Sequence, residues 1–145
     1  MFVQIYTSIA ERLMCQHRAA ENIIFNSSTN RLLMRPKPGK WNIHDNIAHL
    51  ARYQDVFMER INQILQQDQP SFFRYKAEED PAFEDWRTLD TVTLIDRLDL
   101  DRKELYSLVM NLSHERINRI GIHQKFGALT IIEWTEFFLL HRKKE

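Results

Sequence analysis

The stretch WNIHDNIAHLARYQDVFMERINQIL, residues 41–65, decides the fold because it contains a helix start followed by a sustained helical period. Asn42 is a favoured N-cap residue, and Asp45 places a carboxylate in the first turn, where backbone N–H groups are unpaired. The apolar residues that follow recur at helical spacing and share one side of a cylinder; they are Ile43, Ile47, Leu50, Phe57, Ile61 and Ile64. The pattern predicts a long helix that begins at Asn42 and buries this side.

His49 lies on the flank of that apolar side, one helical turn from Asp45 and from Tyr53. We therefore expect it to face a neighbouring helix rather than open water. A single histidine at such a position is more often a partly buried residue bonded to its neighbours than a ligand, and both interpretations stay open without a second donor. His44, in the first turn, is expected to be exposed.

The composition is typical of a folded, helix-rich soluble protein. Hydrophobic residues make up 43% of the 145 residues and charged residues 28%, with only 3 Gly and 4 Pro to interrupt helices. This length suits one domain, residues 1–145, with a core large enough to fold without disulfides.

Charge and cysteine content exclude several classes of function. Basic and acidic residues each number 20, so no net field draws the protein to nucleic acid or to an anionic membrane. The one cysteine, Cys15, excludes an internal disulfide and a CxxC site, and we expect it to be buried or half-buried. No apolar run is long enough to span a bilayer or to act as a signal, so the cytoplasm is the expected compartment.

Three further segments have a helical period of apolar residues; they are residues 2–24, 94–112 and 131–145. Thr91 or Thr93 is the expected cap of the second of these helices, and Thr130 of the third. His17 falls on the apolar side of the first helix, where a core histidine is the favoured interpretation and a pocket residue the second.

Asp101 and Arg102 interrupt the apolar side of the helix over residues 94–112. A charge there is costly unless it is paired or lies in a wet cavity. The two residues could therefore form an internal ion pair or line a pocket.

The two connecting segments differ in their content. Residues 66–90 contain Pro70 and Pro81, have no sustained period and are longer than a connection between bundle helices needs. Five aromatic residues in this segment could either form a pocket wall or only hold a loop in place; they are Phe72, Phe73, Tyr75, Phe83 and Trp86. The pattern of residues 114–130 predicts a turn-rich connection that leaves His114 and His123 in loops.

Four parts of the chain together resemble the DinB/YfiT-like superfamily of metalloenzymes; they are RPKPGKWNIHDNIAHLARYQ (residues 35–54), Arg102, GIHQKFGALT (121–130) and IIEWTEFFLLH (131–141). The resemblance implies an all-α fold, a four-helix bundle with up-down-down-up topology. In that family a divalent metal, usually zinc or nickel, is held by one histidine of the second helix and an HxxxH pair of the fourth.

By position, His49 and His141 match the first two ligands, and Glu145 stands where the family has its third histidine. A carboxylate there completes a set of two histidines and one carboxylate that leaves positions open for water and substrate. We expect four residues to line the pocket; they are Trp41, Tyr53, Arg102 and His123. The implied activity is hydrolysis, or transfer of a low-molecular-weight thiol, on a small-molecule substrate by a homodimer.

A different class of function remains open. The apolar sides of the helices do not depend on a metal, so the chain could be a metal-free, non-catalytic bundle that acts as an interaction or small-molecule binding module. A third possibility is a family member truncated after Glu145.

Overall fold

The computed structural model describes residues 7–19, 22, 33 and 40–140. Several predictions lie outside these residues, namely the first turn of the first helix at Phe2, its end at Ile24, and the predicted ligands His141 and Glu145. No helix in the described part of the chain is long and apolar enough to cross a membrane.

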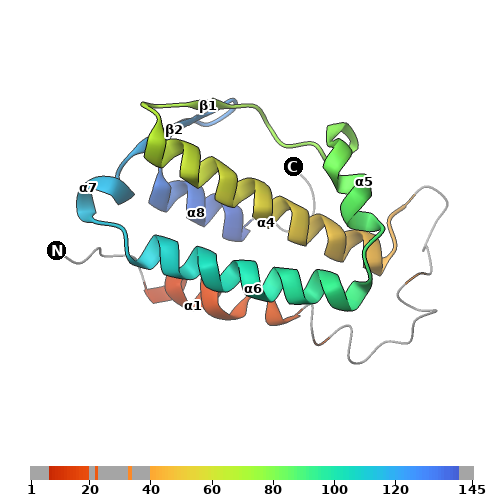
Figure 1. Cartoon of the computed structure of the whole chain (residues 1–145). Coiled ribbons are helices and arrows are strands. Elements are labelled where there is room, and N and C mark those ends of the chain that lie inside the picture. The colour runs from red at the N-terminus through yellow and green to blue at the C-terminus, as the bar shows by residue number, and fades with distance from the viewer. Residues whose placement is uncertain (1–6, 20–21, 23–32, 34–39, 141–145) are drawn as a thin grey trace.

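Four helices form a bundle (Figure 1); they are α1 (Thr7–Cys15), α4 (Ile43–Gln66), α6 (Thr91–Met110) and α8 (Ile131–Leu140). Helices α4 and α6 run in the same direction, and α1 and α8 run in the opposite one. Hydrogen bonds between helices agree with this, because His44 bonds Thr91 near the start of α4 and α6, and Gln16 bonds Leu139 just past the end of α1 and near the end of α8. The expected order of directions is therefore observed.

The two best-defined helix starts were predicted correctly. Asn42 caps α4 in a reciprocal capping box, with the Asp45 N–H donating to Asn42 Oδ1 at 2.6 Å and the Asn42 N–H to Asp45 Oδ2 at 3.3 Å. Thr130 makes the same exchange with Glu133 at the start of α8, at 3.2 and 3.0 Å. Helix α6, in contrast, has Asp90 at its N-cap position and begins at Thr91.

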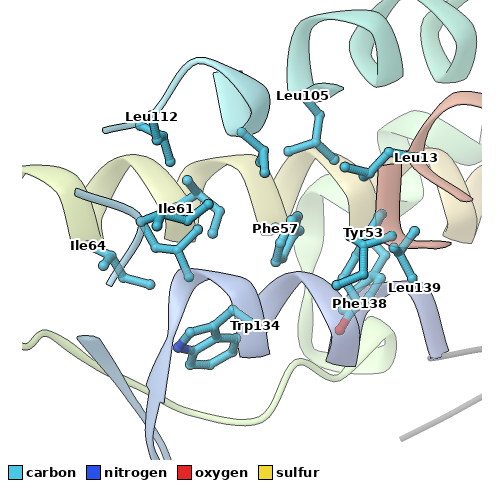
Figure 2. Packing of buried hydrophobic residues seen from close by; sticks show 14 residues of the cluster. Leu13, Tyr53, Phe57, Ile61, Ile64, Leu105, Leu112, Trp134, Phe138 and Leu139 are labelled. Carbon is cyan, nitrogen blue, oxygen red and sulfur yellow. The ribbon is translucent and has the colours of Figure 1, made fainter. Parts of the chain in front are cut away.

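The larger core cluster lies where α4 faces α8 (Figure 2). The rings of Phe57 and Phe138 stack at 4.4 Å between centroids and 10° between planes. The predicted apolar side of α4 supplies much of this cluster, and buried residues of the other three helices close it; among them are Leu13, Leu105, Val109, Trp134 and Leu139. A second cluster packs the first half of α4 against α6 and the segment between them.

A small sheet corrects the all-α prediction. Strands β2 (Ile120–His123) and β3 (Gly127–Thr130) form an antiparallel hairpin, and β1 (Ser71–Phe72) pairs in parallel with β2. With α7 (His114–Ile117), these elements replace the predicted loop, so His114 lies in a helix and His123 in a strand. Strands of two to four residues leave no period in the sequence, and the partner of β1 is distant along the chain.

Residues 67–90, which we call the crossing segment, lead from the end of α4 back to the start of α6 (Figure 1). They contain β1, the short helix η1 (Ala77–Glu79) and α5 (Pro81–Arg87), which was predicted as loop. Asp80 caps α5 by accepting the Ala82 N–H at 3.1 Å, and Pro81 occupies the first helical position, where its missing N–H is not needed.

A turn at Gln16 and His17 interrupts the predicted first helix, so that α1 ends at Cys15. Arg18, Ala19 and Asn22 are helical again. His17 is buried and its Nε2 lies 2.9 Å from Asp99 Oδ1 of α6, which fits a core histidine that joins two helices. Cys15 is exposed, so the prediction that it is at least half-buried is wrong.

We predict that Gly121→Ala destabilises the protein because the hairpin approaches the core too closely for a side chain. An added Cβ would lie 2.7 Å from Ile64 Cδ1 and 3.0 Å from Trp134 Nε1, and that indole N–H donates to the Gly121 carbonyl at 3.1 Å. Such overpacking typically costs about 1–3 kcal/mol. Urea unfolding measures the loss, with Ala128→Ser at the exposed position of the same hairpin as control. Equal stability of the two variants would contradict the prediction.

Candidate metal centre

His49 is buried, at 7% exposure, and four aromatic rings surround its imidazole. The ring centroids lie 5.1 to 6.0 Å from that of His49; these rings are Trp41 at 5.1 Å, Tyr53 at 5.9 Å, Tyr75 at 6.0 Å and Phe83 at 6.0 Å. The structure thus brings His49 together with two of the predicted pocket residues, Trp41 and Tyr53. Apolar rings on several sides keep bulk water away from the imidazole.

The four rings come from two parts of the chain, the region of α4 around His49 and the crossing segment. Tyr53 follows His49 by one helical turn, and Trp41 packs back onto the helix that it precedes. Tyr75 and Phe83 come from the crossing segment, so part of this segment forms a wall on His49, in line with the pocket-wall interpretation. Phe73 does not take part, because it is 81% exposed. Sequence reasoning had no signal that selected Tyr75 and Phe83 from the five aromatics.

Asp80 ties the crossing segment to α4. Its Oδ2 accepts hydrogen bonds from Arg52 Nε and from the Tyr75 hydroxyl, both at 2.7 Å. Burial acts to raise the pKa of Asp80, but the hydrogen bonds from Arg52 and Tyr75 outweigh it, and this pKa is lowered. Burial and the bond to Asp80 raise the pKa of Tyr75, so its hydroxyl stays protonated and donates. Sequence reasoning did not identify Asp80 or Arg52 as important.

His44 holds the other end of the crossing segment. Its Nε2 donates to the Arg87 carbonyl at 2.9 Å, and its Nδ1 lies 2.7 Å from the Thr91 hydroxyl. Arg87 in turn donates to Asp45 at 3.1 Å, a bond that raises the pKa of Arg87. His44 is buried, so the prediction that it is exposed is wrong. Its partners come from distant elements and could not be read from the sequence.

Arg102 is buried in the bundle, at 5% exposure, and it does not pair with Asp101. Its Nε donates to Gln54 Oε1 at 2.6 Å, and Gln54 Nε2 donates to the Leu98 carbonyl at 3.1 Å, which fixes the orientation of that amide. Arg102 Nη1 lies 3.4 Å from the carbonyls of Arg12 and Leu13, close to the end of α1. Burial lowers the pKa of Arg102 to about 10.

Asp101 lies instead in an open groove between α4 and α6, with a volume of about 540 Å³. It pairs there with Arg97 of its own helix at 3.4 Å. The groove is polar apart from Met58; its other lining residues are Arg52, Asp55, Glu59, Asn62 and Glu104. His49, the predicted metal ligand that the structure describes, does not line it.

His123 holds the turn of the β2–β3 hairpin. Its Nδ1 accepts the backbone N–H groups of Lys125 at 2.9 Å and Phe126 at 3.1 Å. Its ring packs on Trp134 and Phe137 of α8, with centroids 5.4 and 5.2 Å away. His123, predicted to line the pocket, thus stabilises the hairpin turn. Its ring contacts Trp134 and Phe137, which are not among the four aromatic residues around His49.

The described residues supply one of the three predicted metal ligands. No group of three His, Cys, Asp or Glu side chains within these residues could hold a metal ion. His49 is linked toward α8 through Tyr53, whose ring stacks on Phe138 at 5.7 Å. His141 follows Leu140, the last residue of α8, directly in the sequence. The histidine and carboxylate donors of the predicted set suit a divalent ion, and His49 is the donor that the described structure supplies.

The described structure is a four-helix bundle with a buried histidine, His49, on α4. Residues 16–144 match the family model of the DinB superfamily. The structure resembles that of YfiT from Bacillus subtilis, described as a "probable metal-dependent hydrolase with an unusual four-helix bundle topology", with a TM-score of 0.70 and 16% identity over 91% of this chain and 74% of YfiT. A comparison with curated proteins finds no match. The chain belongs to the DinB superfamily, and the likeness to YfiT shows the shared bundle fold.

We predict a strong coupling between Arg102 and Gln54. Arg102→Leu leaves the buried Gln54 oxygen without its donor, which should destabilise the protein by about 1–3 kcal/mol. Gln54→Leu combined with Arg102→Leu removes both partners. The double variant should therefore lose less stability than the sum of the losses in Gln54→Leu and in Arg102→Leu. Urea unfolding of the two single variants and the double variant measures the coupling, with the exposed Arg116→Leu as control. Additive losses, or an Arg102→Leu as stable as the control, would count against it.

Proposed function

We propose that this chain is a metal-dependent enzyme that holds a divalent ion, zinc or nickel, between α4 and α8. The observation that carries the proposal is the buried His49 imidazole, enclosed by aromatic rings and linked through Tyr53 to the helix that leads to His141. Membership of the DinB superfamily and the description of YfiT support it.

In this proposal His49, His141 and Glu145 are the ligands. A neutral imidazole donates a ring-nitrogen lone pair, and a carboxylate adds negative charge that suits a divalent cation. Three protein ligands leave positions for water and for the substrate. The aromatic rings around His49 would exclude bulk water from its imidazole, which strengthens electrostatic interactions at the site.

A bound ion would lower the pKa of a water or thiol and so supply a nucleophile near neutral pH. We propose hydrolysis of a small molecule as the reaction, in line with the description of YfiT, and transfer of a low-molecular-weight thiol as the second candidate. Tyr75 is excluded as the general base by its environment, because burial and the bond to Asp80 raise its pKa. Product analysis with and without an added thiol separates the two reactions.

Metal content tests the proposal directly. Elemental analysis of the purified protein should find about one zinc or nickel ion per chain. His49→Ala and His141→Ala should each lose most of it, because two remaining donors cannot hold the ion. His114→Ala is the matched control, since His114 is exposed on α7. Metal-free wild-type protein after growth and dialysis with zinc or nickel, or full metal retention in His49→Ala, would reject the enzyme and leave the non-catalytic module.

A further inference from the structure

We propose that Asp80 is a positioning residue that holds the crossing segment closed over His49. The segment contributes two of the four rings around the imidazole, Tyr75 and Phe83. Both rings reach His49 from outside α4, so their position depends on how the segment is fastened to that helix. The Asp80 carboxylate makes three hydrogen bonds in this region, to Arg52, Tyr75 and Ala82.

Asp80 joins three separate pieces of the site. Its Oδ2 binds Arg52, which lies three residues after His49 on α4, and the hydroxyl of Tyr75. Its Oδ1 caps α5, the helix that carries Phe83, through the Ala82 N–H. The carboxylate is 10% exposed and engages a guanidinium, and such charge-assisted bonds are about twice as strong as neutral ones. One side chain thus determines where both wall rings lie relative to His49.

The far end of the crossing segment is fastened independently. Arg87 binds Asp45 at 3.1 Å, and His44 binds the Arg87 carbonyl at 2.9 Å. Loss of Asp80 should therefore release the Tyr75 side of the wall and leave His44 buried. Local opening of this kind differs from global unfolding, which would expose both histidines together.

The inference rests on the proposed function in one respect, because it takes His49 as the group that the wall controls. The wall itself can be tested in metal-free protein. The probe is diethylpyrocarbonate, which modifies accessible imidazoles, and tandem mass spectrometry reads His49 and His44 separately. The ratio of the two modification rates reports opening at His49 alone.

Asp80→Asn removes the charge that binds Arg52, and Tyr75→Phe removes the hydroxyl and keeps the ring. We expect Asp80→Asn to raise the His49 rate roughly tenfold, which corresponds to about 1.4 kcal/mol of opening free energy. Tyr75→Phe should raise it less, and the His44 rate should stay unchanged. Asp55→Asn is the matched control, because Asp55 binds the same Arg52 at 2.9 Å without touching the crossing segment, and its His49 rate should equal that of the wild type.

Two results would overturn the inference. One is an unchanged His49 rate in both variants, and the other is a parallel rise at His44, which would mean general loosening. Zinc uptake, measured on the same samples, keeps the two proposals apart. Wild-type protein that takes up no zinc, with His49 still exposed by Asp80→Asn, would reject the metal centre and support the wall. Where zinc binds, its dissociation should be faster from Asp80→Asn than from Asp55→Asn.

Discussion

The parallel course of α4 and α6 is the constraint on which the rest of the structure depends. Consecutive helices that run in the same direction need a connection that travels back along the bundle, here along α4, whose 24 residues rise about 36 Å. The crossing segment is this connection, and it contains several aromatic residues. Because it passes along α4, two of these rings reach His49. The wall of the candidate site is therefore a direct product of the topology.

Charged residues fasten the elements that this topology brings together. Arg52 with Asp80, and Arg87 with Asp45, hold the middle and the far end of the crossing segment on α4. Arg102 works differently, since it forms no ion pair with any described residue and donates to the Gln54 amide, with carbonyls near the end of α1 close by. The carbonyl end of a helix carries partial negative charge, which helps to stabilise a buried cation. Arg102 thereby links three helices at one point of the bundle.

Local signals were readable from the sequence, and contacts between distant residues were not. The caps at Asn42 and Thr130 depend on a side chain three positions away, and the burial of α4 depends on its own period. The burial of His44 depends on Thr91 and Arg87, and β1 exists only because β2 lies beside it. Helical spacing placed Tyr53 beside His49, but nothing local selected Tyr75 or Phe83. The long helices could thus be predicted, whereas the small sheet and the wall of the site required the structure.

The central claim is that His49 is a ligand of a divalent metal ion. Diffraction from crystals of the zinc- or nickel-loaded protein, recorded at the absorption edge of the metal, tests it most directly. The account predicts one strong anomalous peak about 2 Å from a ring nitrogen of His49 and at the same distance from a ring nitrogen of His141. An anomalous map without a peak at His49, from protein whose metal content has been measured as one ion per chain, would contradict it.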